Sequence, residues 1–268
     1  MVIASWQGRE PQALELIEDT IQEAAARGEG RAISLSEFAG AVLYNGLGRY
    51  DLALAAARRV CEHDDLALLA WGLVELVEAS ARCNQPAEAD AALRRLAERT
   101  AAVGTDWALG VEARCRALVS TGATAESSYR EAIDRLGRTR IRLALGRAHL
   151  LYGEWLRREG RRVDAREQLH LAHDMLTEMG LEGFAERARR ELRATGEKVR
   201  KRIPETQHDL TPQESQIVRL AGEGATNSEI ASQMFISERT VEWHMRKVFA
   251  KLGINSRRQL RRQPGPTP

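Results

Sequence analysis

The segment from Leu210 to Leu260, LTPQESQIVRLAGEGATNSEIASQMFISERTVEWHMRKVFAKLGINSRRQL, decides the fold of the C-terminal part of this chain. From Thr211 to Glu214 it places a hydroxyl at a helix N-cap, a proline at the first helical position and a carboxylate at the third. A helix is therefore expected to begin there, and Gly222 or Gly224 can end it.

Two further helices are expected within the same segment. Asn227 is positioned to cap a short helix that holds Ile230 and Met234, and Ser237 is positioned to cap another after a tight turn. Two short capped helices separated by a turn form a helix-turn-helix arrangement.

The last of these helices has an apolar stripe on one side and a mixed polar face on the other. The stripe, expected to pack against the first two helices, consists of Val241, Met245, Val248 and Leu252. The opposite face carries Arg239, Trp243, Arg246 and Ala250, flanked by Glu242 and Lys247. Charged helix faces are usually just solvated, but the caps, the turn and the stripe together favour a helix that enters the major groove of DNA.

This segment resembles the C-terminal DNA-binding domain of the LuxR family. The positions that carry the resemblance keep their spacing without gaps, and they are Leu210-Thr211, Glu214, Asn227-Ser228-Glu229-Ile230-Ala231, Ile236-Ser237, Thr240-Val241, His244, Lys251-Leu252-Gly253 and Ser256-Arg257. The resemblance implies a sequence-specific transcription regulator that binds double-stranded promoter or operator DNA as a homodimer, with a fourth helix near Ser256 to Arg262 in the dimer contact. RNA polymerase is a further candidate partner.

Helix geometry and the resemblance together assign contact roles. Glu242, Trp243 and Arg246 are expected to face base edges. The residues expected to reach phosphates are Asn227, Ser228, Ser237, Arg239, Thr240, Lys247, Lys251 and Arg257. Many family members carry a lysine where this chain has Glu242, and a carboxylate there would accept from cytosine rather than donate to guanine.

A repeat occupies the chain upstream of this segment. A short turn followed by a small residue recurs, and the small residues Ala13, Ala53, Ala89, Ser127 and Ala165 lie 40, 36, 38 and 38 positions apart. That period is typical of stacked helix pairs of the tetratricopeptide (TPR) type. The whole chain is therefore expected to be all-α, a TPR-like α-solenoid followed by a four-helix LuxR-type domain. A solenoid presents a concave surface to a peptide, a partner domain or a small effector.

The order of the two parts resembles the C-terminal half of the large ATP-binding LuxR regulators, the LAL or MalT-like group. The ATPase module of that group has no counterpart here, because the sequence contains no Gly-x-x-x-x-Gly-Lys-Ser/Thr phosphate loop. No cofactor is expected. Only Met1 to Gln7 stand where a first helix should precede the first turn, so the array is expected to begin in mid-repeat with an uncapped apolar edge. The chain would then be part of a longer regulator, or its edge would pair with another molecule.

The expected boundaries are residues 1–195 for the helical array, 196–208 for a basic and polar linker, and 209–263 for the DNA-binding domain. The formal net charge of +2 hides a local asymmetry. Basic residues gather before the domain at Arg187, Arg189, Arg190, Arg193, Lys198, Arg200, Lys201 and Arg202. Such a run is usually a solvated helix end, although beside a DNA-binding domain it could touch phosphates.

Other classes of protein find little support in the sequence. The absence of an apolar span or a signal peptide predicts a cytoplasmic protein with no membrane contact. Cys61, Cys83 and Cys115 fit neither a disulfide framework nor a zinc site, and reduced core residues are expected.

No catalytic residue, metal site or enzyme activity is predicted. Glu167, His170 and His173 share one helix face, but no facing acid or cysteine completes a metal site. No serine lies in a nucleophile elbow. The alternative to a transcription regulator is a TPR-like protein-interaction adaptor whose DNA contact is secondary.

Overall fold

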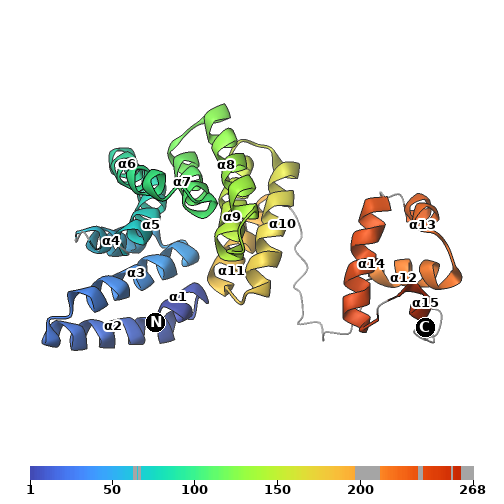
Figure 1. Ribbon diagram of the computed structural model, residues 1–268, viewed down its shortest axis with the longest axis horizontal. Helices are drawn as coiled ribbons and strands as arrows, with labels where there is room; N and C mark the ends of the chain where they lie inside the picture. The colour runs from blue at the N-terminus through green and yellow to red at the C-terminus, as the bar shows by residue number, and fades with distance from the viewer. Residues whose placement is uncertain (63–64, 66–67, 197–211, 235–237, 255, 261–268) are drawn as a thin grey trace. The chain divides into compact units, whose positions relative to one another are not determined.

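The computed structural model describes residues 1–268 except 63–64, 66–67, 197–211, 235–237, 255 and 261–268. The chain divides into two compact units, Met1–Val199 and Arg200–Pro268 (Figure 1). Every regular element in the described ranges is a helix, which confirms the predicted all-α class. Nearly all of the predicted linker, residues 196–208, lies outside the described residues.

The first unit consists of helix pairs that follow one another along the chain (Figure 1). Its helices are α1 (Val2–Trp6), α2 (Glu10–Arg27), α3 (Gly30–Leu47), α4 (Tyr50–Cys61), α5 (Leu68–Arg82), α6 (Pro86–Val103), α7 (Asp106–Val119), α8 (Gly122–Gly137), α9 (Arg142–Arg158), α10 (Arg162–Glu178) and α11 (Glu182–Ala194). The odd-numbered helices pack against one another as an inner layer. Each even-numbered helix packs against the odd-numbered helices before and after it and forms the outer layer.

Small residues allow the paired helices to approach closely. Ala13, Ala53, Ala89 and Ala165 are fully buried, as the repeat predicts. The prediction that Ser127 is the fourth small residue of this series is wrong, because its side chain is exposed. Helix α8 begins at Gly122 itself, so the equivalent fourth position falls on Ala125, which is fully buried.

The two ends of the inner layer meet. Helix α11 packs against α3 and α1, and the rings of Trp6 and Phe184 lie 5.2 Å apart. Gly8 has a left-handed φ of +70°, and a Cβ there would lie 2.6 Å from the backbone nitrogen of Gly183. The layer is therefore a closed arrangement rather than an open row of pairs.

This closure also bears on the expected apolar edge. Helix α1 covers part of α3, and α2 buries Ala13, Ile17 and Ala24 while most of its opposite face is polar. Ile3 and Leu16 are the large apolar residues of these two helices that are exposed. The broad uncapped apolar surface expected there is not present.

Buried charges hold the inner layer together. We define the inner charge network as three glutamates and three arginines from α5, α9 and α11, namely Glu75, Glu78, Arg82, Arg147, Glu154 and Arg187. Arg147 donates to both carboxylate oxygens of Glu75 at 2.6 Å and to Glu78 at 2.7 Å. Such charge-assisted, two-pronged bonds are the strong ones, and they compensate for removing these groups from water.

Arg187 connects the last inner helix to three others. It donates to Glu154 and Glu78 at 2.6 Å and to the backbone carbonyl of Asn45 at 2.9 Å. Its guanidinium also lies 5.3 Å from the ring centre of Tyr50. The interpretation of Arg187 as part of a solvated basic run is therefore wrong, since this residue is a buried structural cation.

The described part of the second unit forms four helices that enclose an apolar core of their own. It is the C-terminal part of the chain in Figure 1. Its helices are α12 (Pro212–Glu223), α13 (Asn227–Met234), α14 (Glu238–Leu252) and α15 (Arg257–Leu260). Helix α12 ends as predicted, because Gly224 takes a left-handed φ of +102° and lets the Ala225 N–H donate to the Leu220 carbonyl at 3.1 Å. Ile217, Ile230 and Val241 are fully buried at its centre.

Candidate DNA-binding interface

Helix α14 has two sharply different faces. The predicted apolar stripe is confirmed: Val241, Met245 and Val248 are buried in the core of the unit, and Leu252 packs against that core. The helix therefore has a fixed rotation, which turns Glu242 and Arg246 to solvent. An exposed carboxylate and an exposed guanidinium one turn apart can reach neighbouring base edges.

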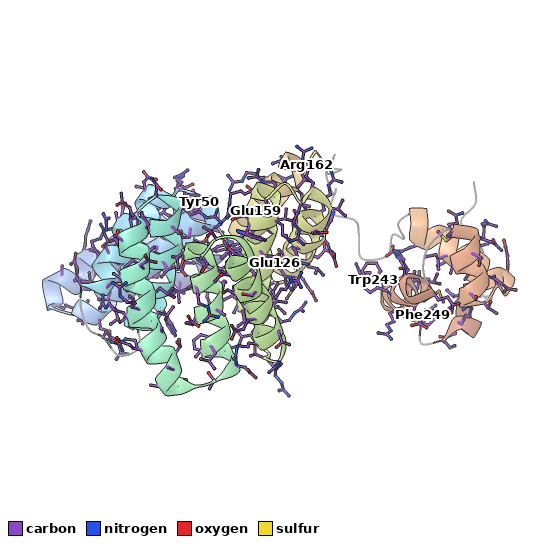
Figure 2. All side chains as sticks on the ribbon, turned by 90° about the horizontal axis from the view of Figure 1, so that it is seen from above. Tyr50, Glu126, Glu159, Arg162, Trp243 and Phe249 are labelled. Carbon is purple, nitrogen blue, oxygen red and sulfur yellow. The ribbon has the colours of Figure 1, made fainter. Side chains whose placement is uncertain are left out.

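Trp243 stands on the same exposed face and is 51% accessible. It projects from the edge of its unit in Figure 2. The Lys247 ammonium lies 4.2 Å from the centre of the indole ring, and the His244 ring meets it edge-on at 4.8 Å. The protein thus covers part of the indole, while the rest stays exposed to solvent.

The start of α13 differs from the prediction in one detail. The capping residue is Thr226 rather than Asn227, because the Thr226 hydroxyl accepts from the Glu229 N–H at 3.3 Å and the Glu229 carboxylate accepts from the Thr226 N–H at 2.6 Å. This is a reciprocal capping box. The backbone and side-chain bonds from Thr226 hold the pKa of Glu229 below its usual range, so the carboxylate stays charged.

Asn227 and Arg257 contact each other. The Arg257 guanidinium donates to the Asn227 side-chain oxygen at 2.6 Å and to the Ala225 carbonyl. Helix α15 is thereby fixed to the start of α13. Both residues were expected at phosphates, and in the free protein they join two helices; any DNA contact uses the remaining donors of Arg257.

The other expected phosphate contacts are placed unevenly. Ser228 is exposed, Lys247 is half-buried over the indole, and Thr240 is half-buried with an interaction within the protein. Ser237, predicted to cap α14, lies outside the described residues, as do the side chains of Arg239 and Lys251. The described contact candidates on α14 are therefore the exposed Glu242, Trp243 and Arg246 and the half-buried Thr240 and Lys247.

The cysteines and the possible metal ligands of the described chain also bear on the predictions. Cys61, Cys83 and Cys115 are free, and burial raises the pKa of Cys61 and of Cys115 to about 12, so both remain thiols. Within the described residues no group of His, Cys, Asp or Glu side chains could hold a metal ion. None of the described helices is both long and apolar enough to cross a membrane.

Comparison with known proteins agrees with this geometry. Residues 208–263 match the family model described as bacterial regulatory proteins, luxR family. A Mycobacterium tuberculosis protein described as a putative HTH-type transcriptional regulator is 48% identical over 65 residues, which are 24% of this chain and 7% of that protein. AlkS of Pseudomonas putida, also an HTH-type transcriptional regulator, is 40% identical over 50 residues, 19% of this chain and 6% of AlkS.

A shorter relative has the same kind of match. The DNA-binding transcriptional activator DevR/DosR of M. tuberculosis is 44% identical over 50 residues, which cover 19% of this chain and 23% of that protein. No solved structure matches this chain. The chain therefore carries a LuxR-type helix-turn-helix domain at its C-terminus, as its sequence predicts, and its matches span only a small part of the relatives' length.

Proposed function

We propose that this protein is a sequence-specific transcription regulator whose LuxR-type domain reads promoter DNA and whose TPR-like helical unit receives the signal. The observation that carries the proposal is the exposed face of α14, which presents Glu242, Trp243 and Arg246 while the opposite stripe is locked in the core. A helix held in this way can place three side chains in a major groove at fixed register.

Arg246 is the strongest candidate for base reading. Its guanidinium fork matches the O6 and N7 atoms of guanine, and it is exposed on the same face as Trp243. Lys247, Ser228 and the free donors of Arg257 then serve the phosphates, together with Ser237, Arg239 and Lys251. Binding as a homodimer through the region of α15 fits two half-sites one helical turn apart.

The test begins with selection of preferred DNA sequences from a random pool by the whole protein. Arg246→Ala should weaken binding to the selected site by about 1–3 kcal/mol and binding to random DNA much less. Arg219→Ala is the matched control, because Arg219 is an exposed arginine of the same domain that pairs with Glu223 on α12. Equal losses on both kinds of DNA would make Arg246 a phosphate contact.

The same experiment separates the regulator from an adaptor. An adaptor with a secondary DNA contact would enrich no sequence from the pool, although its helical unit would still bind a protein partner. Enrichment of a motif with two half-sites would support both the regulator and its dimeric state on DNA. Effects on RNA polymerase are then measured by transcription in vitro from a promoter that carries the motif.

A further inference from the structure

A cavity of about 290 Å³ opens into the inner layer of the first unit. Its walls come from α1, α3, α5, α7 and α9 and are mostly apolar, with the rings of Trp6, Phe38, Trp71 and Trp107 among them. Trp71 and Ile141 are 43% and 42% exposed, so they lie where the cavity meets solvent. Concave, aromatic-lined sites of this size are typical of small-molecule binding.

The lining also contains charged side chains, and one of them is unlike the rest. Glu75 and Arg147 are bonded to each other within the inner charge network. Arg114, on α7, is only 3% exposed, and its Nε is buried without a hydrogen-bond partner. Among the residues that the structure describes, no hydrogen bond or ion pair involves the Arg114 guanidinium.

The charges around this guanidinium do not balance. Arg114 and the inner charge network together contain four arginines and three glutamates, so one positive charge is in excess. Burial, and then repulsion from Arg147, lower the pKa of Arg114 by more than the nearby Glu78 and Glu75 raise it. An arginine does not give up its proton in a protein, so a buried excess cation calls for an anion.

We propose that this cavity binds a small amphipathic carboxylate, whose carboxylate group pairs with the Arg114 guanidinium and whose apolar body lies between the tryptophan rings. A carboxylate accepts two parallel bonds from a guanidinium fork. The aromatic walls complement an alkyl chain or a ring. The proposal rests on the sensing role of the helical unit and names the class of signal that it receives.

Ligand binding at this position would act on the packing of the unit. The cavity is lined by the inner helices from α1 to α9, and two of them, α5 and α9, also carry residues of the inner charge network. A bound carboxylate would neutralise the excess charge and tie these helices together. Its binding therefore raises the stability of the folded unit, and the gain grows with the logarithm of the ligand concentration once that exceeds the Kd.

The test uses the whole protein with octanoate and 4-phenylbutyrate as probes. Calorimetry and thermal unfolding are compared with the uncharged analogues 1-octanol and 4-phenylbutanol, and with inorganic phosphate and chloride. The carboxylates should raise the unfolding temperature of the first unit and bind at least about tenfold more tightly than the alcohols. Equal effects of the alcohols, equal effects of phosphate or chloride, or no binding by either carboxylate would overturn the proposal.

Arg114→Met distinguishes a ligand contact from a structural residue. Replacing an unpaired buried cation by an apolar side chain of similar volume should leave the free protein as stable or more stable, while carboxylate binding is lost. Arg116→Met is the matched control, because Arg116 lies on the same helix and pairs with Glu112 and Glu131. If Arg114→Met unfolds the unit, or folds and still binds octanoate as tightly, Arg114 is not the anion site and the proposal fails.

A second variant makes the test independent of Arg114. Trp71→Ala removes an exposed wall of the cavity and should weaken both carboxylates while phosphate and chloride are unaffected. Binding to the selected DNA sequence, measured without carboxylate, tests the proposed function separately. Intact DNA recognition without carboxylate binding overturns the cavity proposal alone. Carboxylate binding without DNA recognition overturns the proposed function as a transcription regulator.

Discussion

The two units of this chain use arginine in opposite ways. In the first unit Arg147 and Arg187 are buried among glutamates and join helices that are distant in sequence. In the second unit the core is apolar and Arg246 is exposed on the free face of α14. Composition alone therefore does not tell whether an arginine binds a ligand, because the packing around it decides whether its donors are already used.

The largest effect is expected from a substitution in the inner charge network of the first unit. Arg147→Met leaves Glu75 and Glu78 without their main partner, and an uncompensated buried charge costs about 3–5 kcal/mol. Hydrogen exchange followed by segment should show the loss throughout the inner layer and none in α12 to α14. Arg142→Met, which removes an exposed pair with Glu178, is the control and should change stability little. Equal effects of the two variants would contradict a structural role for the network.

Acid should weaken the first unit through the same network. Burial alone raises the pKa of Glu78, but Arg147, Arg187 and Arg82 outweigh burial and hold this pKa well below its ordinary value of 4.5. The pKa of Glu154 is lowered in the same way by Arg187 and Arg82. Because these folded-state values are depressed, their contribution is complete above the ordinary pKa and is lost as the pH falls below it.

The unfolding temperature of the first unit should therefore be flat near neutral pH and fall below about pH 5. Burial also lowers the pKa of His149, which adds an acid dependence that begins nearer its ordinary value of 6.5. The measurement is accordingly made in a His149→Gln background as well as in the unchanged protein. A stability that stays constant down to pH 3 in both proteins would show that the glutamates are not held charged.

A smaller effect is expected at the closure of the inner layer. Gly8 and Gly28 have the same left-handed φ, near +70°, but only Gly8 meets another backbone, that of Gly183. Gly28→Ala should cost about 1 kcal/mol in strain alone, and Gly8→Ala about 2–3 kcal/mol because a clash is added. Chemical denaturation of the two variants measures the difference. Equal costs would mean that α1 and α11 separate without loss.

The smallest effect is expected at the exposed face of α14 in the second unit. Trp243→Ala should weaken binding to the selected DNA by about 1 kcal/mol, because half of the indole is exposed and can pack in the major groove. The second unit should stay folded. Fluorescence anisotropy with labelled DNA gives the affinity, and thermal unfolding gives the stability. A lower stability with unchanged DNA affinity of the folded protein would show that the indole only packs against Lys247 and does not contact DNA.

Sequence patterns predicted what depends on near neighbours. The stripe from Val241 to Leu252 follows from helical spacing, and the helix end at Gly224 follows from its conformational freedom. The errors in these local predictions are displacements by one or two positions along a helix. Thr226 rather than Asn227 caps α13, because both residues can accept the bond and only the position of Glu229 decides between them.

Long-range pairing could not be predicted in this way. Arg187 looks like one more member of a basic run, and its partners Asn45 and Glu78 are 142 and 109 residues away in sequence. A signal was present in the partners: Glu75 and Glu78 interrupt the otherwise apolar run from Leu68 to Ala79, and Glu154 stands between Gly153 and Trp155. Charges among apolar neighbours indicate burial and hence opposite charges nearby, but they do not say which ones.

The bonds of Arg147 and Arg187 across the inner layer also bear on how the unit folds. An array in which each helix pair contacts only its neighbours behaves as a one-dimensional chain that can lose its end pairs one at a time. Here the carboxylates of Glu75 and Glu78 lie 72 and 109 residues from their partners, so the contacts of α3, α5 and α9 are not complete until α11 is in place. The unit should therefore fold slowly for a helical protein and in a single cooperative transition, with no stable partly folded array at either end.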